Sequence, residues 1–97
     1  MEKDLFVGNL LEVYGQFLNP KQRRLAECYY NEDLSLTEIA ENEGVTRQGV
    51  CDILNRVKNR LYGFEKSCGY CEKFLKLKEF AAESNLPKEI TKIIEEL

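Results

Sequence analysis

The chain contains no histidine among its 97 residues. Histidine is the side chain most often used as a general base and a frequent metal ligand. No nucleophile in the sequence has a recognisable base or oxyanion partner. No apolar run approaches the roughly 20 residues of a membrane span, and no window alternates cleanly enough to predict a strand. We therefore expect an all-α protein that is not an enzyme, has no metal or cofactor and does not insert in a membrane.

The N-terminal residues, MEKDLFVGNL, lack the basic start and the long apolar core of a secretory signal. This absence predicts a cytoplasmic protein. A chain of 97 residues is the length of one domain and can bury roughly two-thirds of its unfolded surface. We expect a single helical domain over residues 1–97.

Helical periodicity runs through every segment of the chain. The first predicted helix ends near Leu18, and Asn19 then acts as the N-cap of a second helix over about 20–31, with Pro20 at its first position. Gln22 completes a capping-box pattern with Asn19. The apolar stripe of the first helix comprises Val7, Leu10, Leu11, Tyr14, Phe17 and Leu18.

The middle of the chain predicts a helix-turn-helix over about 35–61. Ser35 caps a short helix, and Ala40 is small enough for a second helix to cross there. Gly44 can adopt the left-handed conformation that the turn needs, and Val45 is the expected buried apolar residue after it. Thr46 caps the second helix, which runs to about Lys66. Its predicted inner face is Val50, Ile53, Leu54, Val57 and Leu61.

The net charge of −3 is not that of a typical nucleic-acid-binding protein, but its distribution is uneven. Residues 47–66 carry five bases and two acids, which makes this the only clearly basic segment. The preceding residues 34–46 carry three glutamates and no base. Glu41 and Glu43 are therefore expected to weaken the positive field near the second helix.

Polar side chains on the second helix of this unit predict contacts with nucleic acid. Arg47 and Gln48 lie in its first turn, where recognition helices contact base edges, and Arg and Gln suit guanine and adenine. Asp52 repels phosphate unless it accepts from a cytosine amino group, and its alternative role is a surface ion pair with Arg56. The predicted nucleic-acid-binding residues are Thr37, Thr46, Arg47, Gln48, Asn55, Arg56, Lys58, Arg23 and Arg24.

In a second interpretation of the same pattern, the two helices form a hairpin that packs within the protein and does not contact nucleic acid. Lys21 and Arg60 are further candidates for backbone contact if nucleic acid does bind. Gly49 lowers helix propensity by up to about 1 kcal/mol relative to alanine. It allows close approach either of DNA or of a neighbouring helix.

The motif CGYC, from Cys68 to Cys71, has three interpretations: half of a zinc site, a redox pair, or packing at a helix junction. A zinc site needs two more ligands, and Cys28 and Cys51 lie on separate helices, with Cys51 expected to point outward. A redox pair is normally found beside a βαβ unit, which is missing. Packing is the interpretation that we favour.

Two amphipathic helices form a predicted C-terminal extension over about 71–97, for a total of five to six helices. Their apolar stripes comprise Cys71, Phe74, Leu77 and Ala81, then Ile90, Ile93, Ile94 and Leu97. A short chain buries such stripes with difficulty. We expect them to fold back on the first helix or to form a homodimer, and we favour the homodimer.

The stretch from Leu10 to about Tyr70, and above all LNPKQRRLAECYYNEDLSLTEIAE, resembles the small bacterial YlxM proteins, the UPF0122 family. Thr46, Arg47 and Gln48 stand where SRQ opens the recognition helix of that family. The resemblance implies an all-helical fold with a helix-turn-helix like region 4 of sigma factors. It also implies a role beside the signal recognition particle, because family members are typically encoded next to its protein GTPase.

Two functional hypotheses follow. The first is a regulatory protein that binds duplex DNA and takes part in the signal recognition particle pathway. The second is an accessory factor that binds the GTPase or RNA of that particle, with the helix-turn-helix as a scaffold. The sequence does not distinguish DNA from RNA, because both present the same phosphate charge.

Overall fold

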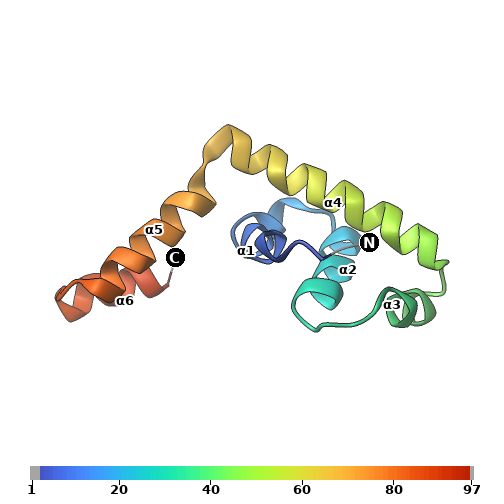
Figure 1. Cartoon of the computed structure of the whole chain (residues 1–97), viewed down its shortest axis with the longest axis horizontal. Helices are drawn as coiled ribbons and strands as arrows, with labels where there is room; N and C mark the ends of the chain where they lie inside the picture. Colours follow the sequence, from blue (N-terminus) through green and yellow to red (C-terminus); the bar gives the residue numbers. More distant parts are fainter. Residues whose placement is uncertain (1–2, 97) are drawn as a thin grey trace.

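A computed structural model describes residues 3–96, and these residues form helices joined by short turns (Figure 1). The all-α prediction is confirmed, with six α-helices in the described range. The elements are α1 (Leu5–Tyr14), the 3-10 turn η1 (Gly15–Phe17), α2 (Pro20–Tyr30), α3 (Leu36–Glu43), α4 (Arg47–Cys68), α5 (Tyr70–Glu83) and α6 (Lys88–Glu95). None of the described helices is long and apolar enough to cross a bilayer.

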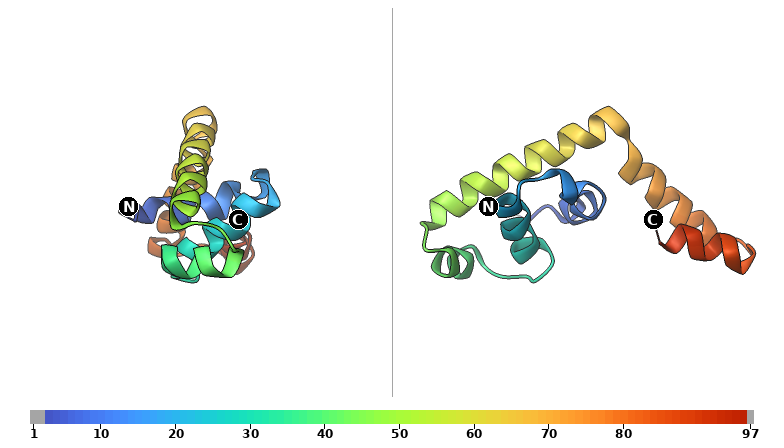
Figure 2. Two further views of the ribbon diagram at one scale, coloured as in Figure 1. Left: turned by 90° about the vertical axis from the view of Figure 1, so that its right-hand side faces the viewer. Right: turned by 180° about the vertical axis from the view of Figure 1, so that it is seen from behind.

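The long helix α4 is the element on which α1, α2 and α3 all pack (Figures 1 and 2). Its inward side chains Val50, Leu54, Val57 and Leu61 are fully buried, whereas Ile53 is half-buried. Complete burial of one such side chain contributes about 1.5–3 kcal/mol to folding. The predicted orientation of this helix is therefore confirmed.

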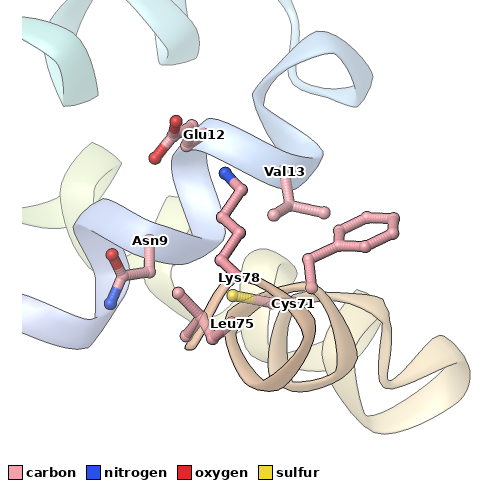
Figure 3. Close-up of a pocket in the computed structure, with 7 residues that line it drawn as sticks. Asn9, Glu12, Val13, Cys71, Leu75 and Lys78 are labelled. Atoms are coloured by element: carbon pink, nitrogen blue, oxygen red, sulfur yellow. The ribbon is translucent and has the colours of Figure 1, made fainter. Parts of the chain in front are cut away.

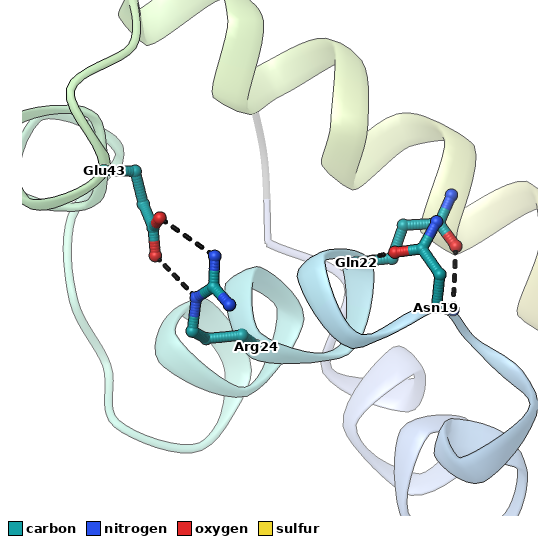
Figure 4. Close-up of polar contacts among 4 residues, drawn as sticks. All are labelled: Asn19, Gln22, Arg24 and Glu43. Atoms are coloured by element: carbon teal, nitrogen blue, oxygen red, sulfur yellow. Dashed lines mark hydrogen bonds and ion pairs between the residues drawn. The ribbon is translucent and has the colours of Figure 1, made fainter.

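Capping boxes begin both α2 and α3, as the sequence predicts. The Asn19 side chain accepts a hydrogen bond from the Gln22 N–H at 2.8 Å, and the Gln22 side chain accepts from the Asn19 N–H at 3.4 Å (Figure 4). Ser35 and Glu38 exchange the equivalent bonds at 3.1 and 3.2 Å. These side chains satisfy N–H groups that have no partner within the helix.

Helix α1 ends at Tyr14, four residues before the predicted end near Leu18. The chain tightens into the 3-10 turn η1, and Leu18 is extended, with φ −83° and ψ 154°. The apolar stripe continues through this turn, so periodicity alone did not reveal the end of the α-helix. The extended Leu18 is itself buried and leads directly into the Asn19 cap of α2.

Glu65 fixes the corner between α4 and α5. Its Oε1 accepts hydrogen bonds from the Tyr14 hydroxyl at 2.6 Å and from the Cys71 N–H at 3.0 Å, and its Oε2 accepts from the Glu72 N–H at 3.0 Å. The Tyr70 N–H donates to the Tyr14 hydroxyl oxygen at 3.1 Å. A carboxylate at a helix N-terminus satisfies free N–H groups and interacts favourably with the helix dipole. Side chains of α1 and α4 thus set the direction of α5.

The predicted turn at SCGYC is confirmed, and Gly69 makes it with φ 68°. Beyond this turn, the first half of α5 packs against α1, and the Lys78 side chain extends from α5 toward α1 (Figure 3). The two helices enclose a cavity of about 120 Å³. It is lined by Asn9, Glu12, Val13, Cys71, Phe74, Leu75 and Lys78. This contact is the expected fold-back of the C-terminal extension, and on α5 it involves residues from Cys71 to Lys78.

The rest of the extension projects away from α1–α4 as a helical hairpin (Figures 1 and 2). Helix α6 packs on α5 mainly through the buried Ile94, whereas Leu77, Ile90 and Ile93 are exposed. The described residues therefore leave much of the predicted apolar stripes uncovered. Leu97, the last residue of the second stripe, lies outside the described residues.

Tyr30 carries a buried hydroxyl that has no hydrogen-bond partner in residues 3–96, and burial raises its pKa to about 12. We expect Tyr30→Phe to leave stability unchanged or to raise it by up to about 1 kcal/mol, because it removes an unsatisfied polar group. Urea unfolding measures the change. Tyr14→Phe is the matched control and should destabilise the protein, because the Tyr14 hydroxyl donates to Glu65. A loss above about 1 kcal/mol for Tyr30→Phe would contradict the prediction.

Candidate nucleic-acid interface

The turn between α3 and α4 has the geometry that a helix-turn-helix requires. Gly44 is left-handed, with φ 69°, and both its N–H and that of Val45 donate to the Ala40 carbonyl. The Thr46 hydroxyl oxygen then accepts from the Gly49 N–H at 3.0 Å and caps α4. These features confirm the predicted turn and cap.

The prediction that Val45 is buried is wrong, because its side chain is 36% exposed. Ile39, Ala40 and Val50, on the two helices that flank the turn, are all buried. The turn therefore closes through its backbone hydrogen bonds to Ala40, and Val45 lies at the surface beside the first turn of α4.

The first turn of α4 presents Arg47 and Gln48 to solvent, as the orientation of the helix requires. Asn55 and Arg56, two turns further along, are also exposed. Neither arginine side chain has a hydrogen bond or an ion pair within residues 3–96. The two unpaired guanidinium groups are separated by roughly 13 Å along the helix and by about two and a half turns, so they leave α4 on opposite sides.

Asp52 pairs with Gln48 rather than with Arg56. The Gln48 amide nitrogen donates to an Asp52 carboxylate oxygen at 3.0 Å, and the described ion pairs do not include Asp52 with Arg56. The amide oxygen of Gln48 is left as an acceptor. The sequence analysis did not predict this pair, although the i,i+4 spacing on a helix favours a Gln–Asp hydrogen bond.

The other predicted basic residues are already engaged. Arg24 binds Glu43 through two hydrogen bonds of 2.8 and 3.0 Å (Figure 4), and the guanidinium holds the pKa of that carboxyl below its usual value. Arg23 pairs with Glu27 at 2.9 Å, and Lys58 lies 3.5 Å from Asp4. Arg24 thereby neutralises one of the two glutamates that were expected to weaken the positive field.

Three further candidates lie at the surface in different settings. Thr37 is exposed in the first turn of α3, and Lys21 is exposed in the first turn of α2. The Arg60 guanidinium lies over the Phe64 ring at 5.6 Å, a cation–π arrangement toward the far end of α4. The structure therefore gathers Thr46, Arg47 and Gln48 at one end of the molecule and places Arg60 away from them.

Gly49 owes its position to the cap and not to a neighbouring helix. A Cβ added there would lie 3.2 Å from the Thr46 Oγ1, and no atom of another helix comes within 4 Å of it. The alternative that Gly49 admits a packed helix is therefore wrong. The close approach of a ligand at this point stays a prediction.

The cysteines occupy different environments. Cys71 is fully buried in the core, whereas Cys68 is exposed, so the packing interpretation describes Cys71 alone. Cys51 was expected to point outward but is half-buried against the core. In the part of the chain that the structure describes, no three acidic or cysteine side chains form a metal-binding cluster.

Two helices joined by a left-handed glycine turn, with a polar first turn on the second helix, define a helix-turn-helix protein. A family model described as "Putative helix-turn-helix protein, YlxM / p13 like" matches residues 1–97. The chain belongs to this family, UPF0122.

Several members of the family are close in sequence. A UPF0122 protein of Thermoanaerobacter is 40% identical over 103 residues, covering 96% of this chain and 88% of the relative. One from Clostridium perfringens is 34% identical over 104 residues, covering 99% and 93%. One from Clostridium kluyveri is 39% identical over 79 residues, covering 81% and 71%. The similarity therefore extends over most of both chains, including the helix-turn-helix.

Proposed function

We propose that this protein is a regulatory nucleic-acid-binding protein that inserts the first turn of α4 into the major groove of duplex DNA. The observation that carries this proposal is the exposure of Arg47 and Gln48 at the tip of a buried, capped helix. In a helix-turn-helix, base contacts come from this turn of the second helix. It acts by binding rather than by catalysis.

The charges of the interface support binding of moderate strength. Arg47 and Arg56 are available to phosphate or base edges, and Arg24 offsets Glu43 beside the turn. The negative charge of Asp52 repels phosphate. The ion pair with Asp4 offsets part of the positive charge of Lys58. One copy would make few phosphate contacts, so we further propose that the protein binds DNA as a homodimer.

A second candidate is an accessory factor of the signal recognition particle that contacts its GTPase or its RNA. The exposed apolar side chains of the α5–α6 hairpin favour this candidate, because such surfaces commonly mark contacts with another protein. The link to the particle itself comes from the family resemblance. In this arrangement the helix-turn-helix is a scaffold.

Titration of duplex DNA and of the particle's RNA at several salt concentrations tests the proposal. With three or four phosphate contacts, log affinity for duplex DNA should fall with log salt with a slope of about −3. The purified GTPase is the parallel probe for the second candidate. A slope near zero for both nucleic acids would overturn the proposal, and salt-insensitive binding of the GTPase would support the accessory factor.

A further inference from the structure

An apolar hollow lies at the corner where η1, the end of α4 and the start of α5 meet. It has a volume of about 470 Å³ and is built mainly from aromatic rings. Phe17 and Tyr70 are each more than half exposed there, and Phe17 packs edge-on against Phe64 at 5.8 Å. The complete lining is Val13, Tyr14, Gln16, Phe17, Phe64, Cys68, Tyr70 and Phe74.

A second apolar surface lies on α6, at the other end of α5. Ile90 and Ile93 are 47% and 63% exposed, and Ile94 is the buried residue of this helix. Helices shorter than about 12 residues are marginal in water without tertiary contacts, and α6 has 8 residues. Packing of its exposed isoleucines against a further surface would therefore stabilise α6.

The two apolar surfaces lie at opposite ends of α5, so two copies of the hairpin can cover each other's surfaces. The α5 residues that line the hollow, Tyr70 and Phe74, are at the N-terminal end of this helix. Helix α6 follows the C-terminal end of α5 (Figure 1). If two α5 helices pair antiparallel about a two-fold axis, the α6 of each copy comes beside the hollow of the other. The exposed Leu77 and Phe80 lie between these two ends on α5.

The charges of the hairpin favour the same arrangement. Residues 60–76, around the hollow, carry four bases and two acids, and residues 77–96 carry three bases and five acids. Antiparallel pairing places each positive end against a negative end, twice in one dimer. Parallel pairing would place like charges together, which costs free energy.

We propose that the hollow of one copy takes the Ile90–Ile93 face of α6 from a second copy, in a two-fold symmetric dimer along α5. Such an isologous interface uses the same patch on both copies and closes on itself. It buries the exposed isoleucines and the aromatic rings of both copies. The inference deepens the proposed homodimer by naming its surface, and its test requires no nucleic acid.

Sedimentation equilibrium of the full chain tests the surface. The wild type should have twice the 11.3 kDa mass of one chain. Ile93→Glu should weaken the dimer at least about tenfold, because it places a charge in an apolar contact. Leu5→Glu is the matched control, since Leu5 is 77% exposed on α1 and outside the surface, and it should stay dimeric.

Charge reversal tests the antiparallel direction. Lys73→Glu and Glu83→Lys should each weaken self-association, and an equimolar mixture of the two variants should form a heterodimer, in which the charges are again complementary. Lys21→Glu on α2 is the control.

A monomeric wild type overturns the proposal, as does a dimer that Ile93→Glu leaves intact. Recovery in the mixture supports it, and its absence overturns the antiparallel arrangement. Because self-association is measured without nucleic acid, a wrong surface and a failure to bind DNA are detected separately.

Discussion

Replacement of Glu65 by alanine is expected to lower the free energy of unfolding by about 2–3 kcal/mol, because several charge-assisted hydrogen bonds are lost at once. The Tyr14 hydroxyl and the N–H groups of Cys71 and Glu72 all donate to this carboxylate. Without it, the first turn of α5 has unsatisfied donors and α1 loses its polar link to the corner. Chemical denaturation monitored by circular dichroism measures the loss.

Two variants separate this network from a general effect of removing a charge. Glu79→Ala, on the exposed side of α5, should change stability by less than about 0.5 kcal/mol. Tyr14→Phe combined with Glu65→Ala should cost less than the two single changes added together, because both remove the same hydrogen bond. Additive costs would show that the residues act independently.

The contribution of Glu65 should also depend on pH. Burial is the largest influence and raises the pKa of this carboxyl, but the hydrogen bonds from Tyr14, Glu72 and Cys71 outweigh it and the net shift is downward. A lowered pKa in the folded state stabilises the protein above the unfolded value of about 4.3. The stabilisation is lost as the pH falls through the folded value. The advantage of wild type over Glu65→Gln should therefore shrink below about pH 4.

Arg47→Ala is expected to reduce affinity for duplex DNA by about 10- to 100-fold, within the range for loss of an arginine that contacts a base edge. Arg47 is exposed and has no partner within residues 3–96, so the change should leave stability within about 0.5 kcal/mol of wild type. Fluorescence anisotropy with a labelled duplex measures the affinity. An unchanged affinity in a folded variant would remove Arg47 from the interface.

Asp52→Asn, on the same helix, is a control that should change the affinity for DNA in the opposite direction. It removes a negative charge that opposes phosphate and keeps a polar side chain beside Gln48. Affinity should rise about 3- to 10-fold at low salt, since one repulsive interaction near the surface is worth about 1 kcal/mol. Arg24→Ala tests the engaged arginine, and it should have a smaller effect than Arg47→Ala because Arg24 already binds Glu43.

The local features of the fold were predictable because they depend on residues three or four positions apart. Asn19 with Gln22 and Ser35 with Glu38 specify two helix starts, and Gly44 specifies the turn. The inner stripe of α4 follows from the period of an amphipathic helix. The exposure of Arg47 and Gln48 then follows directly, and their contact with nucleic acid stays a prediction.

Two of the features that the sequence did not reveal depend on contacts between distant residues. Tyr14 and Glu65 are 51 residues apart, and Arg24 and Glu43 are 19 apart, so neither pair leaves a local pattern. Val45 shows a similar limit, because the exposure of its side chain is a property of the assembled fold and not of the local pattern. The sequence analysis placed Arg24 among the nucleic-acid-binding residues but could not detect that its charge is engaged by Glu43.

Helix α4 is continuous from Arg47 to Cys68 and joins the end of the molecule that carries Arg47 and Gln48 to the corner that carries the hollow. At 22 residues it is about 33 Å long, a rigid connection on this scale. In a dimer that forms through the α5–α6 hairpins, this length would hold the first turns of the two α4 helices at one separation. Such a dimer would select inverted repeats whose half-sites have a fixed spacing, so a scan of spacer lengths should give a single maximum of affinity.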